Sequence, residues 1–157
     1  MSYVNMFGIA GLLTAAALLA GAAAPADEKR APDDKHHMGA HDECAKACGE
    51  CQRACDSCAH HCGELVASGK NDHLRTLHTC SDCANFCAAA AQIVARQGPM
   101  SATICEACAK ACDVCGAACE KFPDDDHMKM CAMECRKCEK ACKEMLKHTD
   151  AGEKKDK

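Results

Sequence analysis

The sequence predicts an all-α protein, an antiparallel up-down four-helix bundle with a Cys-lined core. Its 18 cysteines fall in four segments, and every gap between neighbouring cysteines within a segment is three or four residues. This is the spacing of the inward a and d positions of a bundle helix. Ala, Glu, Lys and Cys dominate all four segments, and none alternates polar and apolar residues as a half-buried strand would.

Helix-breaking residues separate the four segments. Residues 69–72 begin with Gly, Gly98-Pro99 closes the second segment, and Pro123 stops the third. Residues 124–126 are all Asp and supply a cap and favourable charge for the last helix. The predicted helices span about residues 37–68, 73–96, 101–121 and 127–147. Because the connecting loops are short, we expect consecutive helices to run antiparallel.

The N-terminal 26 residues have a different composition from the rest of the chain. Residues 1–26 contain no charged side chain, and Ala24-Pro25-Ala26 fits a small-residue cleavage motif, with Ala20-Gly21-Ala22 as a second option. We therefore expect a secretory signal peptide, cleaved after Ala26 or Ala22, and an exported, periplasmic protein. The alternative is an uncleaved membrane anchor, since the apolar run is about long enough to span a bilayer.

The rest of the chain divides into three parts. Residues 27–40 are charged and contain Pro, Gly and His, which indicates a flexible lead-in. Residues 41–148 form the Cys-rich bundle. Residues 149–157 are polar and are expected to form a disordered tail.

The composition excludes some functions and leaves the core short of large side chains. The formal net charge is −4, and acidic and basic residues alternate along the chain without a basic stripe and interleaved aromatics. Nucleic acid is therefore a poor candidate partner. With three Phe, one Tyr and no Trp, the chain has little conventional core material. Something besides packed apolar side chains must hold the interior together.

The cysteines form one stripe on each helix. The first stripe extends backward through His41 to His37, and the fourth extends forward to Met145. The stripes consist of Cys44, Cys48, Cys51, Cys55, Cys58 and Cys62; Cys80, Cys83 and Cys87; Cys105, Cys108, Cys112, Cys115 and Cys119; and Cys131, Cys135, Cys138 and Cys142.

Two of three interpretations of these stripes are weak. Cysteine can serve as a small apolar core residue, but 18 at one period would leave a loose and reactive core. A disulfide scaffold is the default for Cys-rich exported chains. However, residues three or four apart on a helix have Cβ atoms about 5–6 Å apart, whereas a disulfide needs about 3.5–4.5 Å. Only disulfides between different helices are compatible with this geometry.

The third interpretation is metal binding. Thiolate is a soft ligand that selects Cu(I), Zn(II) or Fe–S clusters. With metal–sulfur bonds of about 2.3 Å, two sulfurs on one metal lie about 4.5 Å apart, a separation that CxxxC and CxxC pairs on a helix can meet. Such two-coordinate pairs suit Cu(I). The chain lacks both the knuckles of structural zinc sites and the Cys run with its Pro that holds Fe–S clusters. Continuous stripes predict many ions in a row, which favours storage over catalysis.

Each end of the predicted bundle gathers His and Met residues. In an up-down bundle, the start of the first helix meets the end of the fourth. Imidazole and thioether are plausible weaker Cu(I) ligands there, and the alternative is an ordinary frayed end. The candidate ligands are His37, Met38, His41 and Met145, with Met100 and His148 near them. At the opposite end lie His73, His127 and Met128, as caps or as surface residues.

The pattern resembles that of the Csp-type copper storage proteins, a family of Cys-rich four-helix-bundle copper-binding proteins. The resemblance covers about residues 37–147 and rests on repeated CxxxC and CxxC pairs such as Cys44/Cys48 and Cys51/Cys55. It implies Cu(I) held by thiolates inside a bundle, many ions per chain, and copper storage without catalysis. The His and Met residues near one mouth are similar to the family's proposed uptake end. Exported members can carry twin-Arg signals, a pair that this sequence lacks.

We therefore expect a copper storage protein that is not an enzyme, because no nucleophile–base pair stands apart from the thiols. Multiple Cu(I) ions are the expected ligand, and a copper donor or acceptor protein is a further expected partner. Membrane contact is expected only if residues 1–26 stay uncleaved, and homo-oligomerisation is left open. The alternatives are a disulfide-stapled structural or redox protein and a zinc or cadmium buffer similar to metallothionein.

Overall fold

The computed structural model describes residues 39–153, with side chains described through residue 148. Four α-helices make up this part of the chain: α1 (Ala40–Ala67), α2 (Leu74–Ala95), α3 (Ser101–Cys119) and α4 (Asp126–Glu153). A short 3₁₀ turn, η1 (Asn71–His73), precedes α2. The described residues contain no strand, so the all-α prediction is confirmed.

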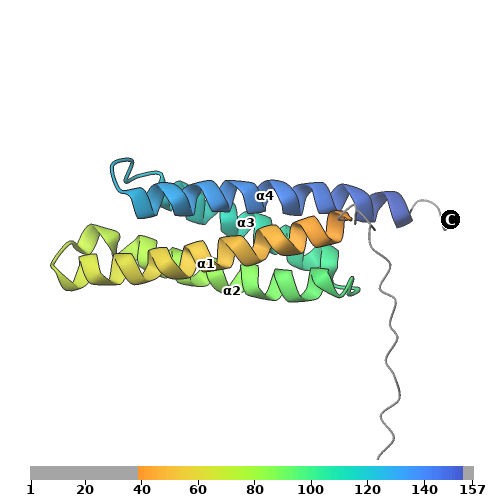
Figure 1. Ribbon diagram of the computed structural model, residues 1–157, viewed down its shortest axis with the longest axis horizontal. Helices are drawn as coiled ribbons and strands as arrows, with labels where there is room; N and C mark the ends of the chain where they lie inside the picture. Colours follow the sequence, from red (N-terminus) through yellow and green to blue (C-terminus); the bar gives the residue numbers. More distant parts are fainter. Residues whose placement is uncertain (1–38, 154–157) are drawn as a thin grey trace, which may run out of the picture. The chain divides into compact units, whose positions relative to one another are not determined.

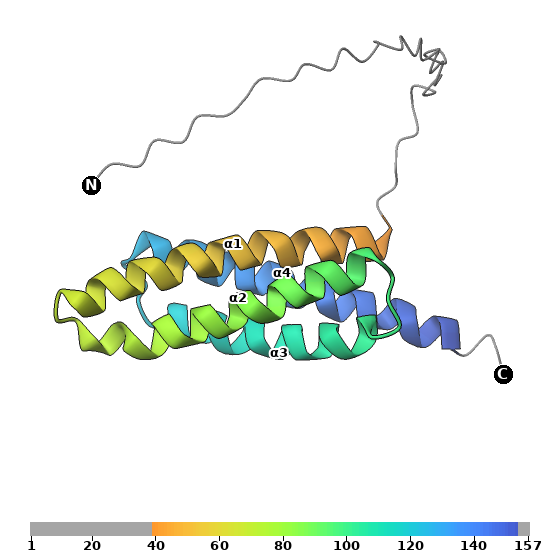
Figure 2. The ribbon, with the colours of Figure 1, turned by 90° about the horizontal axis from the view of Figure 1, so that it is seen from below.

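The helices form an antiparallel up-down bundle. α1 packs against α2 and α4, and α3 packs against the same two helices, so α1 and α3 lie on one diagonal and α2 and α4 on the other. Figures 1 and 2 show the α1–α2 turn and the α3–α4 loop at one end, with the start of α1 and the α2–α3 loop at the other. No helix within residues 39–153 combines the length and the apolar character needed to cross a membrane.

The predicted and observed helix ends differ in detail. α4 continues through Glu153 and so includes the first five residues of the predicted disordered tail, which was expected to begin at residue 149. The left-handed backbone after α2 falls on Gln97 (φ 51°) and not on Gly98. A Cβ at Gly98 would make only ordinary van der Waals contact with Ile93, so the structure does not require glycine there. The residues expected to form a signal peptide and most of the expected lead-in lie outside the described residues, so the proposed domain limits stay predictions.

The core is built from small side chains. Every cysteine is at most 1% exposed, and Ala84 and Ala90 are buried among them. The largest fully buried side chains are Met128, Met145 and Val94. Burial of such side chains provides less apolar area than an ordinary Leu- and Phe-rich core. The bundle therefore depends on additional contacts outside the core.

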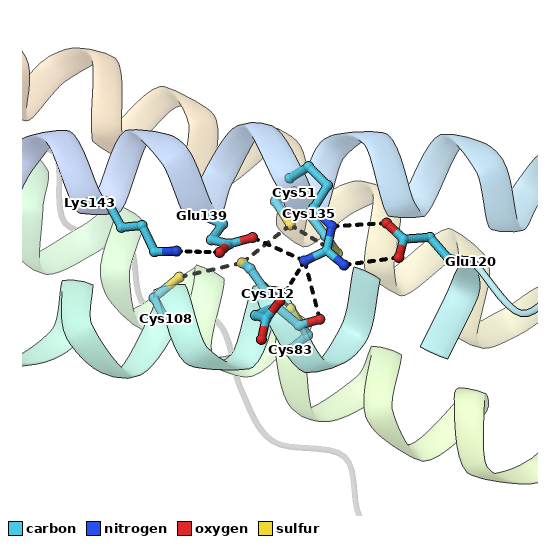
Figure 3. Close-up of polar contacts among 10 residues, drawn as sticks. Cys51, Cys83, Cys108, Cys112, Glu120, Cys135, Glu139 and Lys143 are labelled. Carbon is cyan, nitrogen blue, oxygen red and sulfur yellow. Dashed lines mark hydrogen bonds and ion pairs between the residues drawn. The ribbon is translucent and has the colours of Figure 1, made fainter. Parts of the chain in front are cut away.

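One such contact joins α3 to α4 on the outer surface. The guanidinium of Arg136 donates a bidentate pair of hydrogen bonds to Glu120 at 2.9 and 3.0 Å, and a further bond to Asp113 at 2.7 Å. Glu139 completes the cluster and also pairs with Lys143 (Figure 3). Gly116 makes room for it, because a Cβ there would lie 3.1 Å from the guanidinium carbon.

Candidate metal centre

The thiols fill the centre of the bundle along its length. All 18 are free, and all but Cys58 and Cys62 have a sulfur on another helix at 3.6–4.0 Å. Contacts even cross the diagonal of the bundle: Cys51 on α1 meets Cys112 on α3 at 3.9 Å. Figure 3 shows these two thiols together with Cys83 and Cys135 in the interior. The predicted stripes thus converge into one column of sulfur without an open channel.

Within a helix, the sulfurs are paired but not bonded. Cys51 and Cys55 are 3.9 Å apart, and the pair Cys108 and Cys112 is 4.0 Å apart. A disulfide would bring the two sulfurs to about 2.05 Å. Two sulfurs on opposite sides of one metal ion lie about 4.6 Å apart, at twice the metal–sulfur bond length of about 2.3 Å. The thiols therefore need to separate by only about 0.6 Å to admit an ion.

The sulfurs also group into quartets drawn from several helices. Within each quartet all four sulfurs lie within 4.8 Å of one another. Neighbouring quartets share members: Cys55 and Cys135 belong to two, as do Cys51, Cys83 and Cys131. The quartets include Cys48/Cys108/Cys138/Cys142, Cys51/Cys83/Cys87/Cys112, Cys51/Cys55/Cys83/Cys135, Cys55/Cys115/Cys131/Cys135 and Cys58/Cys80/Cys119/Cys131. Shared thiols can bridge ions, so the column suits clusters better than isolated sites.

The thiols polarise one another. The S–H of Cys115 and other neighbours lower the pKa of Cys119 to about 5, and contacts with Cys105 lower the pKa of Cys44. By contrast, burial raises the pKa of Cys62 to about 11. Since only thiolates are metal ligands, an incoming soft cation must displace the protons of thiols such as Cys62.

At the end where α1 begins, the sulfur column opens to a surface groove. We call this the groove end, defined by Cys44, Cys105, Cys142 and Met145. The groove has a volume of about 280 Å³, and Cys44, Met145 and His148 line it together with Glu43 and Lys140. Cys44 lies 3.7 Å from Cys105 and 3.8 Å from Cys142. Cys44 is the one cysteine in the lining of this groove, and it is 1% exposed.

The structure brings together only part of the predicted mouth. Met145 is fully buried in the groove wall, and His148 lies on its rim. His41 is half-buried on α1 and is not part of the groove lining. Met100 is 54% exposed on the α2–α3 loop and is also apart from the groove, contrary to expectation. His37 and Met38 lie outside the described residues.

The opposite end of the bundle also carries a surface groove, of about 370 Å³, which is lined by His73 and Phe122 and by no cysteine. We call this the plug end, defined by Cys58, Cys62, His73, Phe122 and Met128. His73 stacks on Phe122 with ring centroids 4.1 Å apart. Cys58 donates its S–H to the thioether sulfur of fully buried Met128 at 3.4 Å. Thus His73 and Met128, which the sequence left as caps or surface residues, are both buried.

A polar contact that the sequence did not predict ties the plug end together from outside. His61 Nε2 lies 2.7 Å from Asp125 Oδ2, and the His61 ring stacks on His127 at 4.3 Å. Asp125 also accepts a hydrogen bond from the backbone N–H of Met128 at 3.2 Å and so caps α4. The capping role of the Asp run was readable from sequence. The pairing with His61 was not, because His61 lies on α1 and Asp125 lies 64 residues away on the α3–α4 loop.

These features define a class of protein: a four-helix bundle whose interior is a thiolate site for several soft metal ions. The chain belongs to the copper storage protein family, Csp, whose sequence profile matches residues 37–147. The resemblance to this family that the sequence showed is therefore confirmed. No curated protein sequence matched the chain.

Solved structures support the same family. A cytosolic copper storage protein from Streptomyces lividans, loaded with five coppers, is 31% identical, with 68% of this chain and 92% of that chain covered and a TM-score of 0.63. The same protein loaded with 10 copper equivalents is 30% identical, with 74% of this chain and 92% of that chain covered and a TM-score of 0.63. The Cu(I)-bound copper storage protein BsCsp3 from Bacillus subtilis is 32% identical, with 68% of this chain and 98% of that chain covered and a TM-score of 0.63.

One expectation needs correction. The exported, periplasmic location expected from residues 1–26 is contradicted, because the Streptomyces lividans relative is a cytosolic copper storage protein. An Ala- and Gly-rich run is a weak signal without the basic residues that usually precede it, and this run has none. Residues 1–26 themselves lie outside the described residues.

Proposed function

We propose that this protein stores copper as multiple Cu(I) ions held by the thiolates of its interior. The sharing of thiols between neighbouring quartets carries this proposal, since it allows bridged ions in a continuous column. The family and its copper-loaded relatives support the same function. Stored copper would also cross-link all four helices and supply the cohesion that a small-residue core lacks.

All 18 cysteines serve as ligands in this proposal. Cys44, Cys105 and Cys142 receive copper at the groove end, and Met145 offers a thioether beside them. His37, Met38 and His41 are secondary ligands on the lead-in and the first turn of α1. Each ion that binds releases thiol protons, so uptake raises the acidity of the solution.

The role is binding and not catalysis. The buried reactive groups of the described residues are thiols packed against each other, an arrangement that suits metal holding rather than turnover of an organic substrate. A copper donor or acceptor protein is the expected partner, and the groove end is the surface where it would exchange its ion.

Metal competition tests the proposed function. Reduced protein loaded with zinc is mixed anaerobically with Cu(I) in a buffered chelator, and the released zinc is measured. Copper storage predicts complete displacement of zinc, because soft thiolates prefer Cu(I). A parallel thiol count on copper-free protein is expected to find all 18 thiols reactive. A protein that keeps its zinc, or that shows few free thiols, would contradict the proposal.

A further inference from the structure

The face of the bundle formed by α2 and α3, which lie side by side in Figure 2, carries an apolar surface groove. The groove has a volume of about 430 Å³, and its lining includes Phe86 from α2 and Val114 from α3. Phe86 is 42% exposed and Val114 is 58% exposed, in a chain that has only three Phe. Large apolar side chains that share an exposed groove are typical of a surface that binds a partner.

Two charged side chains of opposite sign border this groove. Asp82 comes from α2 and Lys110 from α3, and both are exposed. Neither side chain has a hydrogen bond or an ion pair with any other residue whose side chain the structure describes. The next acid along α3, Asp113, is already held by Arg136 at 2.7 Å. The groove therefore suits a partner that presents a base opposite Asp82 and an acid opposite Lys110.

A sulfur contact between α2 and α3 gives the relative levels of these side chains along the bundle. Cys83 on α2 meets Cys112 on α3 at 3.8 Å. Because the two helices run antiparallel, Asp82 and Lys110 are offset by about three residues, which is about 4.5 Å along the bundle at 1.5 Å per residue. A lysine side chain is long enough to span this offset.

A second copy of this chain presents the required charges when it is related to the first by a two-fold axis along the groove. Such an axis places α2 of each copy over α3 of the other at the same level. Asp82 of each copy then lies opposite Lys110 of the other copy. By the same levels, Phe86 lies over Ala107 and Ala111 of the other copy, whose small side chains leave room for the ring.

We propose that this chain forms a two-fold symmetric homodimer through the α2–α3 face. Both charges at the groove gain a partner, and the exposed Phe86 and Val114 are covered. The dimer also covers one side of the thiol column, since Cys83 belongs to the groove lining although it is 1% exposed. The groove beside Cys44 shares no lining residue with this face and stays accessible. Copper takes no part in these contacts, so the dimer is expected with and without copper.

Sedimentation velocity of the full-length, reduced protein tests the interface over micromolar to millimolar concentrations. We expect the wild type to reach twice the mass of one chain. Asp82→Lys and Lys110→Asp each turn two ion pairs per dimer into like-charge contacts, so each is expected to raise the dissociation constant about tenfold or more. Asp56→Lys reverses an exposed charge on α1, away from the groove, and is expected to keep the wild-type value.

Charge reversal on both sides tests the two-fold geometry. The double variant Asp82→Lys/Lys110→Asp restores opposite charges across the interface and is expected to dimerise as the wild type does. A mixture of the two single variants is expected to form heterodimers, because one copy then presents two lysines and the other two aspartates. Circular dichroism is expected to show the wild-type helicity for every variant, since both positions are exposed.

Three results would overturn the homodimer. The first is a wild type that stays monomeric over the whole concentration range. The second is a dimer that both single variants form as readily as the wild type. The third is association that the single variants weaken and that neither the double variant nor the mixture restores, because Asp82 and Lys110 would then not meet across a two-fold axis.

Discussion

The two ends of the bundle finish the same column of thiols in different ways. At the groove end, Cys44 lines an open groove beside Met145. At the plug end, the stacked rings of His73 and Phe122 line the surface groove, and no cysteine reaches its lining. The cysteine spacing is the same toward both ends, so the difference lies in the residues that follow the stripes. A column with a cysteine in the groove lining at one end only is expected to fill from that end.

Removal of copper is expected to cause the largest change in the stability of the two ends. A ligand that binds only the folded state stabilises it by about 2.7 kcal/mol when its concentration is 100 times Kd, and several ions act together. We expect copper-free protein to melt well below the loaded form in anaerobic calorimetry. Hydrogen exchange is expected to increase most at the groove end, where the described residues include no pair of stacked rings. Equal melting of the two forms would contradict a stabilising role for copper.

Phe122→Ala is expected to open the plug end. The substitution removes the ring that stacks on His73, and for this half-buried Phe we expect a loss of about 2 kcal/mol, below the 3–5 kcal/mol typical of fully buried Phe. Chemical denaturation measures the loss, and capture by an excess of a Cu(I) chelator measures release. Faster release than from wild type is expected, with Phe122→Leu as the conservative control. Unchanged release would show that the rings do not retard copper.

Cys44→Ser is expected to slow uptake, because it removes the one thiol in the lining of the groove. Stopped-flow transfer from a Cu(I)-chelator complex measures the initial rate. Cys62→Ser changes the same chemical group at the plug end and is expected to leave that rate unaltered. Equal slowing by both substitutions would mean that copper enters without regard to the groove.

Asp125→Asn is expected to have the smallest effect. Burial raises the pKa of Asp125, but hydrogen bonds from His61 and from the Met128 backbone lower it more, so the pKa lies below 3.8. A lowered carboxyl pKa stabilises the fold above the unfolded pKa, and this stabilisation is lost as the pH falls through the folded pKa. Because Asn can still cap α4, we expect a loss of about 1 kcal/mol or less at pH 7.

The pH dependence of that loss is the check on its cause. Denaturation of both proteins from pH 7 down to acidic pH is expected to show the difference shrinking below about pH 3.8, where Asp125 becomes protonated. A difference that stays constant over this range would assign the effect to packing and not to charge.

The fold and the column were predictable because they depend on local periodicity. A gap of three or four residues places Cys51 and Cys55 on one face of a helix whatever the rest of the chain does. The loop residues Gly69 and Pro123 then fix where each helix ends. The burial of all 18 thiols followed from these two features alone.

The structure of the two ends was not predictable, because it depends on contacts between residues that are far apart in the sequence. The sequence places Met100 near the start of α1, but its loop turns it toward solvent. The bond between His61 and Asp125 joins residues 64 positions apart, and neither lies on a cysteine stripe. Likewise, the burial of His73 depends on a stack with Phe122 from another loop. The expected location failed for a different reason, since an apolar run alone does not specify an export route.

Anaerobic titration of the fully reduced protein with Cu(I) tests the central claim most directly. Four-coordinate sites that share no thiols would hold at most about four ions among 18 thiols. The shared quartets predict more than four Cu(I) bound tightly per chain in competition with a chromophoric Cu(I) chelator. A stoichiometry of four or fewer, or copper that the chelator removes readily, would contradict storage in a shared thiolate column.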